Sequence, residues 1–154
     1  MDKLWAPWRS KYIHLRKKKK CIFCGNKQSK SDGKRYIVDR SKYSYSMLNL
    51  YPYNNGHVMV APHRHVKDMQ SLSDAELIDM MKLVRSTVKK LEKKLKPHGF
   101  NIGFNTGKIA GAGFAGHIHV HIVPRWTGDT NFMPVTAGTK IISESLDAMM
   151  KVLK

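Results

Sequence analysis

The stretch HIHVHIVP, from His117 to Pro124, alternates histidine with β-branched apolar residues. In a β-strand successive side chains point to opposite faces, so His117, His119 and His121 share one face and the residues between them share the other. The apolar face belongs in a core. Packing alone does not explain three imidazoles in strict alternation, so the pattern predicts a strand that is half core and half chemical site.

Other segments with the composition of strands surround this one. The predicted strands lie at 36–38, 43–50, 57–62, 100–105 and 117–124. A turn signal at 53–56 indicates consecutive antiparallel strands. Because the strands are grouped before and after one long helix, we expect an α+β domain with an antiparallel sheet. A length of 154 residues, 42% of them hydrophobic, predicts a single domain over 1–154.

The long helix is predicted from Ser73 to Lys96. Ser73 and Glu76 have the spacing of a capping box. The residues expected on its core face, at steps of three and four, are Leu77, Met81, Val84, Val88, Leu91 and Leu95. A second, short helix is expected from about residue 143 to 153.

The chain is strongly basic. It carries 28 Lys and Arg against 11 Asp and Glu, a net charge of +17, with fourteen of the cations in residues 1–42. This balance favours anionic partners such as nucleotides, although a run such as Lys17–Lys20 is more often a solvated face than a polyphosphate or nucleic-acid patch. A nucleic-acid-binding module would explain the charge but not the histidines, so nucleic acid is not the expected partner. Without a signal peptide pattern or an apolar run near the ~20 residues of a membrane span, we expect a cytoplasmic protein without membrane partners.

Two kinds of chemistry fit the histidines. In one, residues roughly 6.6 Å apart along a strand converge on a catalytic zinc ion, so that His117, His119 and His121 are ligands of a metal-dependent hydrolase. In the other, one imidazole attacks a phosphorus atom that nearby backbone N–H groups hold. The glycine-rich loop at 108–116 favours the second, because glycines let amides approach phosphate oxygens. Catalytic zinc sites of hydrolases often use a carboxylate as the general base, and no Asp or Glu follows the triad before Asp129.

These residues resemble the histidine triad (HIT) family of nucleotide hydrolases and transferases. HIHVHIVP matches the family signature, and NGHVMVAPHRHV stands at the usual distance upstream, across a helix. The resemblance covers nearly the whole chain. The bacterial diadenosine tetraphosphate phosphorylase branch is the part of the family that this chain resembles, through the segments MDKLWAPWRSKYI, CIFC, FNTGKIAGAGFAG and GDTNFMPV. The resemblance implies a HIT-like sheet, a homodimer, and cleavage of adenosine polyphosphates through a nucleotidyl-histidine intermediate. Adenosine phosphoramidates are the alternative substrates within the same chemistry.

The resemblance also implies roles for individual residues. His119 would attack the α-phosphorus, His121 would contact the phosphate and orient the nucleophile, and His57 would assist the triad. The residues implied in substrate binding are Asn49 for the ribose, Asn105, the loop amides of Gly111, Ala112 and Gly113, and His121. The loop sequence GAGFAG carries no side-chain hydroxyl or amide, unlike many hydrolase-type members, which favours the phosphorylase-like branch.

The only two cysteines form a C-x-x-C pair within the basic N-terminal segment, about 1–35. In a cytoplasmic chain such a pair is more often metal-binding or redox-active than a structural disulfide. The family resemblance implies a structural zinc ion held by Cys21, Cys24, His65 and His117, with His63 as a substitute for His65. A closed Cys2His2 site would leave His119 free for catalysis.

Overall fold

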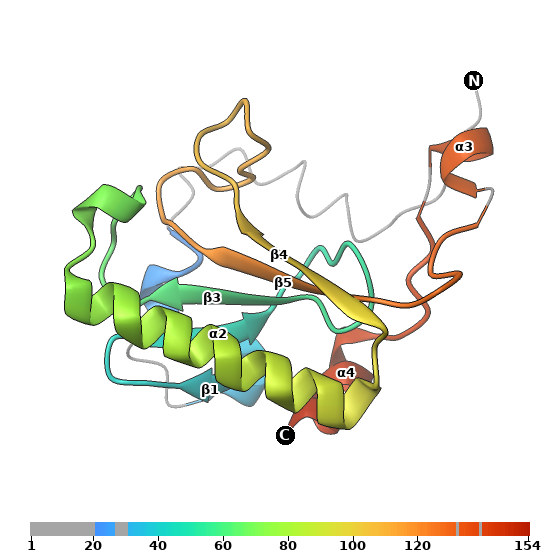
Figure 1. Cartoon of the computed structure of the whole chain (residues 1–154), viewed down its shortest axis with the longest axis horizontal. Helices are drawn as coiled ribbons and strands as arrows, with labels where there is room; N and C mark the ends of the chain where they lie inside the picture. Colours follow the sequence, from blue (N-terminus) through green and yellow to red (C-terminus); the bar gives the residue numbers. More distant parts are fainter. Residues whose placement is uncertain (1–20, 27–30, 132, 139) are drawn as a thin grey trace.

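The computed structural model describes residues 21–26, 31–131, 133–138 and 140–154, and over them the chain forms a five-stranded antiparallel sheet (Figure 1). The strands are β1 (Ile37–Arg40), β2 (Ser44–Leu48), β3 (Val58–Pro62), β4 (Gly99–Phe104) and β5 (Val120–Arg125). Their order in the sheet is β1-β2-β3-β5-β4, so β5 lies between β3 and β4. The α+β prediction is confirmed. Most of the basic N-terminal segment, including Lys17–Lys20, lies outside the described residues.

The long helix α2 (Asp74–Leu95) lies across one face of the sheet (Figure 1). Its predicted capping box is present: the Ser73 side chain accepts from the Glu76 N–H, and the Glu76 side chain accepts from the Ser73 N–H. The expected core stripe is wrong at Met81, which is 47% exposed, whereas Met80 is fully buried. The buried face of the helix therefore runs through Met80, Leu83 and its neighbours rather than through Met81.

Two shorter α-helices and several turns of 3-10 helix lie elsewhere in the described residues. The C-terminal helix α4 (Leu146–Leu153) packs beside α2, and it begins later than predicted because the Ser145 side chain caps it by accepting from the Ala148 N–H. A five-residue helix α3 (Met133–Ala137) was not predicted. Single turns of 3-10 helix lie at Cys24–Asn26, Gly33–Arg35 and Met69–Ser71. No helix in the described part of the chain is both long and apolar enough to cross a membrane.

The sheet separates two apolar clusters. On the helix side Val120 and Ile122 of β5 join the cluster that α2 and α4 cover. On the other side Met59 of β3 pairs with His121 and joins a cluster around Phe23. The predicted alternation of core and histidine is therefore present, which follows from the period of two in a strand.

The histidine strand is shorter than predicted. It begins at Val120 rather than His117, so His117 and His119 lie in an irregular segment just before β5. The Ile118 N–H explains this, because it donates to the carbonyl of Val66 in a loop rather than to a neighbouring strand.

Candidate active site and metal centre

Three histidine side chains gather on the face of the sheet opposite α2. His57 immediately precedes β3, His121 lies on β5, and His119 lies just before β5. The ring centroids are 5.1 Å apart for His57 and His121, and 4.8 Å apart for His119 and His121. All three residues are at most 8% exposed. The structure thus brings together the three residues that the sequence singled out for catalysis.

Hydrogen bonds fix the protonated nitrogen of His57 and His121. The backbone N–H of Tyr53 donates to Nδ1 of His57 at 3.0 Å, so this nitrogen carries the lone pair and Nε2 carries the hydrogen. The Nε2 of His57 lies 2.9 Å from Nδ1 of His121 and donates to it. The hydrogen of His121 is then on its Nε2, which lies 3.5 Å from the side-chain amide of Asn105. This chain of bonds leaves His121 with an N–H on the side away from His57.

The tautomer of His119 is set by a backbone carbonyl. Its Nδ1 lies 2.8 Å from the carbonyl oxygen of His117, which can only accept, so Nδ1 carries the hydrogen. The Nε2 of His119 therefore carries a free lone pair when the ring is neutral. A neutral imidazole with one nitrogen anchored and the other unprotonated is the form that a nucleophilic histidine requires.

Burial keeps these rings neutral. Desolvation lowers the pKa of His119, and desolvation together with the neighbouring histidines lowers the pKa of His57 to about 3 and that of His121 to about 4. These rings are shielded from water, so a protonated ring would be poorly solvated, and the neighbouring groups of the triad are histidines rather than carboxylates. At neutral pH all three are therefore uncharged.

These pKa values predict the pH profile of the free protein. Protonation would occupy the lone pair of His119, and a lowered pKa means that protonation occurs only at lower pH. We therefore expect kcat/KM to stay level as the pH falls past about 6.5, the ordinary pKa of histidine. It should decline only at more acidic pH. Initial rates at substrate concentrations far below KM, measured across this range, check the expectation. An acidic limb centred at or above the ordinary value would contradict it.

The glycine-rich loop between β4 and β5 is a tight turn beside the histidines. Gly107 and Gly111 have positive φ angles of 86° and 88°, which favour glycine. The N–H of Gly111 donates to the Lys108 carbonyl and the N–H of Ala112 donates to the Gly107 carbonyl. Two of the three amides expected to hold phosphate, those of Gly111 and Ala112 but not Gly113, are thus engaged within the loop as it is folded here. Their release would require the loop to change shape when substrate binds.

Asn49 and Asn105 flank the histidines on two sides. Asn49 is buried, its Oδ1 accepts from the Tyr51 N–H at 2.9 Å, and its Nδ2 lies 3.3 Å from Nδ1 of His57. The Nδ2 of Asn105 lies 3.5 Å from the Gly111 carbonyl, so this side chain sits between the loop and His121. Both positions are next to the reacting groups rather than remote from them.

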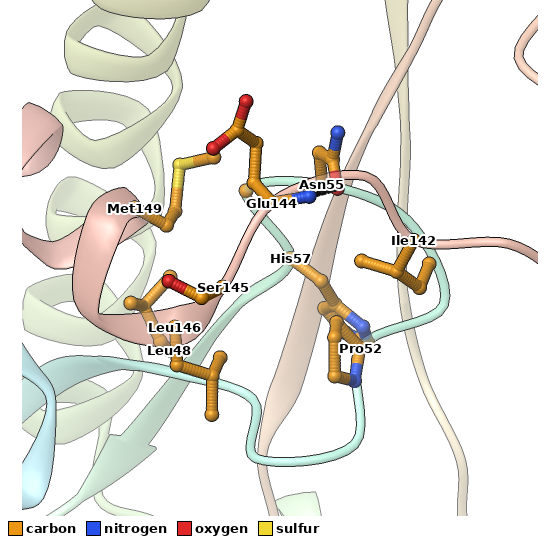
Figure 2. Close-up of a pocket in the computed structure, with 10 residues that line it drawn as sticks. Leu48, Pro52, Asn55, His57, Ile142, Glu144, Ser145, Leu146 and Met149 are labelled. Carbon is orange, nitrogen blue, oxygen red and sulfur yellow. Dashed lines mark hydrogen bonds between the residues drawn. The ribbon is translucent and has the colours of Figure 1, made fainter. Parts of the chain in front are cut away.

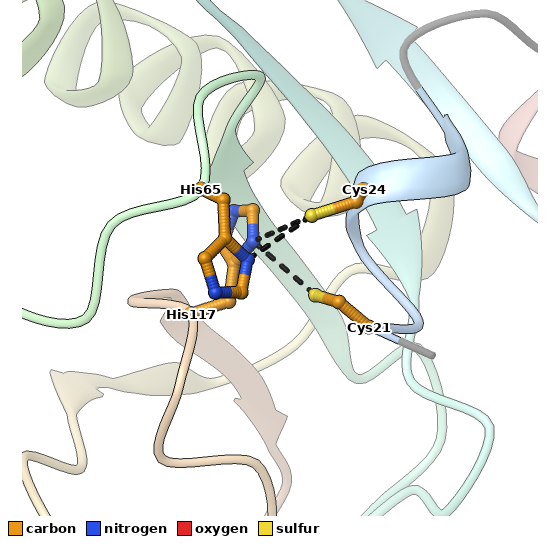
Figure 3. A group of neighbouring side chains, drawn as sticks. All are labelled: Cys21, Cys24, His65 and His117. Atoms are coloured by element: carbon orange, nitrogen blue, oxygen red, sulfur yellow. Dashed lines mark hydrogen bonds between the residues drawn. The ribbon is translucent and has the colours of Figure 1, made fainter. Parts of the chain in front are cut away.

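The two cysteines meet two histidines to form a second site. The ligand atoms of Cys21, Cys24, His65 and His117 all lie within 4.8 Å of one another (Figure 3). The Sγ of Cys24 is 3.1 Å from Nδ1 of His65, and Nδ1 of His117 is 3.4 Å from Sγ of Cys21 and 3.8 Å from Sγ of Cys24. Zinc bond lengths in a tetrahedron place sulfur and nitrogen ligands about 3.5 Å apart, so the residues fit a zinc ion.

The neighbours of the cluster also suit a metal. The Nε2 of His117 donates to the Pro62 carbonyl at 3.0 Å, which leaves Nδ1 as the ligand and matches the usual support of a metal-bound histidine. Desolvation and the adjacent Cys21 thiol raise the pKa of Cys24, which disfavours its thiolate form. A bound cation would stabilise the thiolate and so offset this effect. His63 is not part of the group, because its Nε2 bonds to the Ser41 carbonyl. The histidine of this loop that lies in the group is His65, as the first choice of ligand predicts, and not the alternative His63.

The three-histidine metal site is not formed. Over the described residues, the one group that brings at least three potential ligands together contains His117 but neither His119 nor His121. Asp129, the nearest acidic residue after the triad in sequence, is ion-paired with Arg125 at 2.6 Å, and this pairing holds the pKa of its carboxyl well below the usual range. It also accepts from Asn54 at 2.7 Å, which ties the 49–57 loop to the end of β5. Asp129 is thus a structural anchor and not a general base.

Several residues at the site were not found from the sequence. Tyr53 supplies the N–H that sets the His57 tautomer, and its ring lies 4.5 Å from that of His57. Phe23 lies between the cysteines, and its ring lies 4.7 Å from that of His119. The sequence offered two signals, an aromatic residue within CIFC and another four positions before His57. Neither spacing by itself indicates contact with a histidine.

A small cavity behind the 52–57 loop is not a substrate site. It has a volume of about 10 Å³ and lies between this loop and the start of α4 (Figure 2). Leu48, Leu146 and Met149 line it together with polar groups, including those of Asn55 and Glu144. A space of this size holds one water molecule and no nucleotide.

Known proteins are similar to this chain in sequence and in fold. The HIT domain family model matches residues 30–128. An AP-4-A phosphorylase of Mycobacterium tuberculosis is 36% identical over 161 residues, which cover 99% of this chain and 83% of the relative. An adenosine 5'-monophosphoramidase of Schizosaccharomyces pombe is 35% identical over 105 residues, 68% of this chain and 74% of the relative. A crystal structure of a hypothetical histidine triad nucleotide-binding protein from Sulfolobus tokodaii has a TM-score of 0.67 and 26% identity, and the match covers 86% of this chain and 89% of that one. The chain therefore belongs to the HIT domain family.

Proposed function

We propose that this protein cleaves adenosine polyphosphates, diadenosine tetraphosphate first among them, by transferring an adenylyl group to His119 and then to phosphate or water. The observation that carries the proposal is the bond from His119 Nδ1 to the His117 carbonyl, which leaves Nε2 as a buried, neutral nucleophile. The similarity to the M. tuberculosis AP-4-A phosphorylase over nearly the whole chain supports the choice of substrate.

The first step forms a bond between Nε2 of His119 and the α-phosphorus and breaks the bond to the bridging oxygen, which leaves with ATP. The ring becomes an imidazolium, and the His117 carbonyl stabilises it through the Nδ1 hydrogen. The Nε2–H of His121, directed by His57, is placed to donate to a phosphoryl oxygen as negative charge grows there. In the second step phosphate or water attacks the same phosphorus and restores neutral His119. The products of diadenosine tetraphosphate are then ADP and ATP with phosphate, or AMP and ATP with water.

A zinc ion held by Cys21, Cys24, His65 and His117 is part of this proposal. Four protein ligands leave no open position, so the metal would supply rigidity rather than a reactive water. Because the carbonyl of His117 accepts from His119, a ligand of this site also directs the nucleophile. The metal would thus hold the segment before β5 in the shape that catalysis needs.

Product analysis tests the reaction. Purified protein is incubated with diadenosine tetraphosphate, with and without inorganic phosphate, and the nucleotides are separated by chromatography. We expect ADP and ATP that depend on phosphate, since the M. tuberculosis relative that is similar over 99% of this chain is an AP-4-A phosphorylase. AMP and ATP formed equally in both reactions would instead make water the acceptor. The absence of turnover in both would refute this substrate.

Adenosine 5'-phosphoramidate is the second candidate substrate. The S. pombe adenosine 5'-monophosphoramidase, similar over 68% of this chain, motivates it. The same histidine chemistry applies, with an amine rather than a nucleotide as the leaving group. Comparing kcat/KM for the two substrates under identical conditions decides between them, and a higher value for the phosphoramidate would reverse the ranking.

A further inference from the structure

The ring of Phe23 lies against the proposed nucleophile. Phe23 stands between the two cysteines, is 1% exposed, and has its ring centroid 4.7 Å from that of His119 with an interplanar angle of 31°. The same ring lies 5.0 Å from His117 at an angle of 37°. One side chain of the cysteine turn therefore covers both the metal-site histidine and the catalytic histidine.

The backbone of Phe23 is firmly held. Its carbonyl accepts from the Tyr45 hydroxyl at 3.0 Å and from the Asn26 N–H at 3.1 Å. The side-chain amide of Asn26 donates to the same Tyr45 hydroxyl, and both residues are buried. The ring of Phe114, from the glycine-rich loop, meets the Phe23 ring edge-on at 6.0 Å. Phe23 thus joins the cysteine turn, the sheet and the loop at one point.

We propose that Phe23 is a positioning residue for His119. Because Phe23 belongs to the Cys21–Cys24 turn, an ordered turn holds the Phe23 ring in place, and that ring in turn holds the nucleophile. This inference rests on the proposed function for its catalytic consequence. The bond from His119 Nδ1 to the His117 carbonyl anchors one nitrogen but still permits the ring to tilt about that bond. The flat face of Phe23 blocks the tilt on one side.

The same contact favours the charged intermediate over the resting state. Adenylylation of His119 turns a neutral imidazole into a cation, and a cation within about 6 Å of an aromatic ring face is attracted by the ring. The distance of 4.7 Å and the tilt of 31° place the two faces against each other. An interaction that strengthens as the positive charge develops lowers the barrier to the chemical step and not merely the energy of binding.

Two substitutions of Phe23 separate ring-face contact from simple space filling. Phe23→Leu keeps an apolar side chain but has no aromatic face, and Phe23→Ala removes both. We expect kcat to fall about 10-fold in the first and about 10²-fold in the second, the scale of a misplaced reacting group, with KM within twofold. The control is Ile22→Ala in the same turn, since Ile22 is 46% exposed. This control should match the unsubstituted protein.

Three further readouts test the proposal, and the first two do not depend on turnover. Metal content, measured by atomic absorption, should stay the same in all variants. Nitrogen–proton correlation spectra of the imidazoles should show narrow His119 ring resonances in the unsubstituted protein and resonances broadened by exchange between ring orientations in Phe23→Ala, because the ring is then free to tilt about its Nδ1 bond to the His117 carbonyl. Removing the metal by chelation should lower kcat by a smaller factor in Phe23→Ala than in the unsubstituted protein, because one route from the turn to His119 is already lost.

The outcomes are decisive. A normal kcat in Phe23→Leu would overturn the role of the ring face, and narrow His119 ring resonances in Phe23→Ala, as in the unsubstituted protein, would overturn the positioning role. A loss of kcat that accompanies metal loss and is restored by added zinc would show that Phe23 serves the metal site only. If the unsubstituted protein turns over no adenosine polyphosphate, the proposed function fails, and the imidazole spectra still decide whether Phe23 positions the His119 ring.

Discussion

Replacing His119 by glutamine is expected to lower turnover of diadenosine tetraphosphate by roughly 10⁴- to 10⁶-fold, the scale seen when a nucleophile or its essential partner is removed. A glutamine amide has nearly the reach of the imidazole but no nucleophilic lone pair on nitrogen. Binding should persist, because the neighbouring groups His121, Asn105 and Asn49 are unchanged. Single-turnover kinetics with enzyme in excess measure the loss without interference from product release.

The covalent adduct gives a direct companion measurement. In the unsubstituted protein, rapid quenching without phosphate followed by intact-mass spectrometry should show one added adenylyl group, and His119→Gln should show none. His98→Gln is the matched control, because His98 is exposed and bonds to Thr127 at the far end of the β4–β5 pair. Substantial activity in His119→Gln, or an adduct on another residue, would exclude His119 as the nucleophile.

Loss of the metal ligands is expected to cause the largest change in stability. A metal that binds only the folded chain stabilises it by about 4 kcal/mol at 1,000 times its Kd, so Cys24→Ser or His65→Ala should lower Tm by roughly 10 °C. The ligands link the 21–26 turn to loops 41 and 93 residues away in sequence, and without the ion these links are single sulfur–nitrogen contacts. Calorimetry and zinc content on the same samples measure both effects.

The histidine pair in one loop supplies the control. His63 is two residues from His65 but bonds to the Ser41 carbonyl and stacks on Tyr45. His63→Gln should retain one metal per chain, whereas His65→Ala should lose it. Added zinc should restore Tm in protein stripped by a chelator, but not in His65→Ala. Equal metal content in the two variants would contradict the ligand assignment.

Features set by neighbouring residues could be predicted from the sequence. The capping box at Ser73 and Glu76 formed as expected, because both partners lie within one helical turn. The antiparallel sheet followed from short alternating segments grouped around one helix. The start of β5 was misjudged, because the Ile118 N–H is taken by Val66, a partner 52 positions earlier that alternation does not reveal.

The chain sequence by itself determined which residues face the core and which face the site, since period-two alternation in HIHVHIVP is a local property of the extended backbone. Only the tertiary structure decided which partner each histidine meets. His117 turns toward Cys21, 96 residues away, and His121 toward His57, 64 residues away. Such pairings depend on how the strands are ordered in the sheet and on which loops then approach one another. The three similar histidines therefore have three different partners, a cysteine for His117, the His117 carbonyl for His119 and the His57 ring for His121, through contacts that no spacing in the sequence encodes.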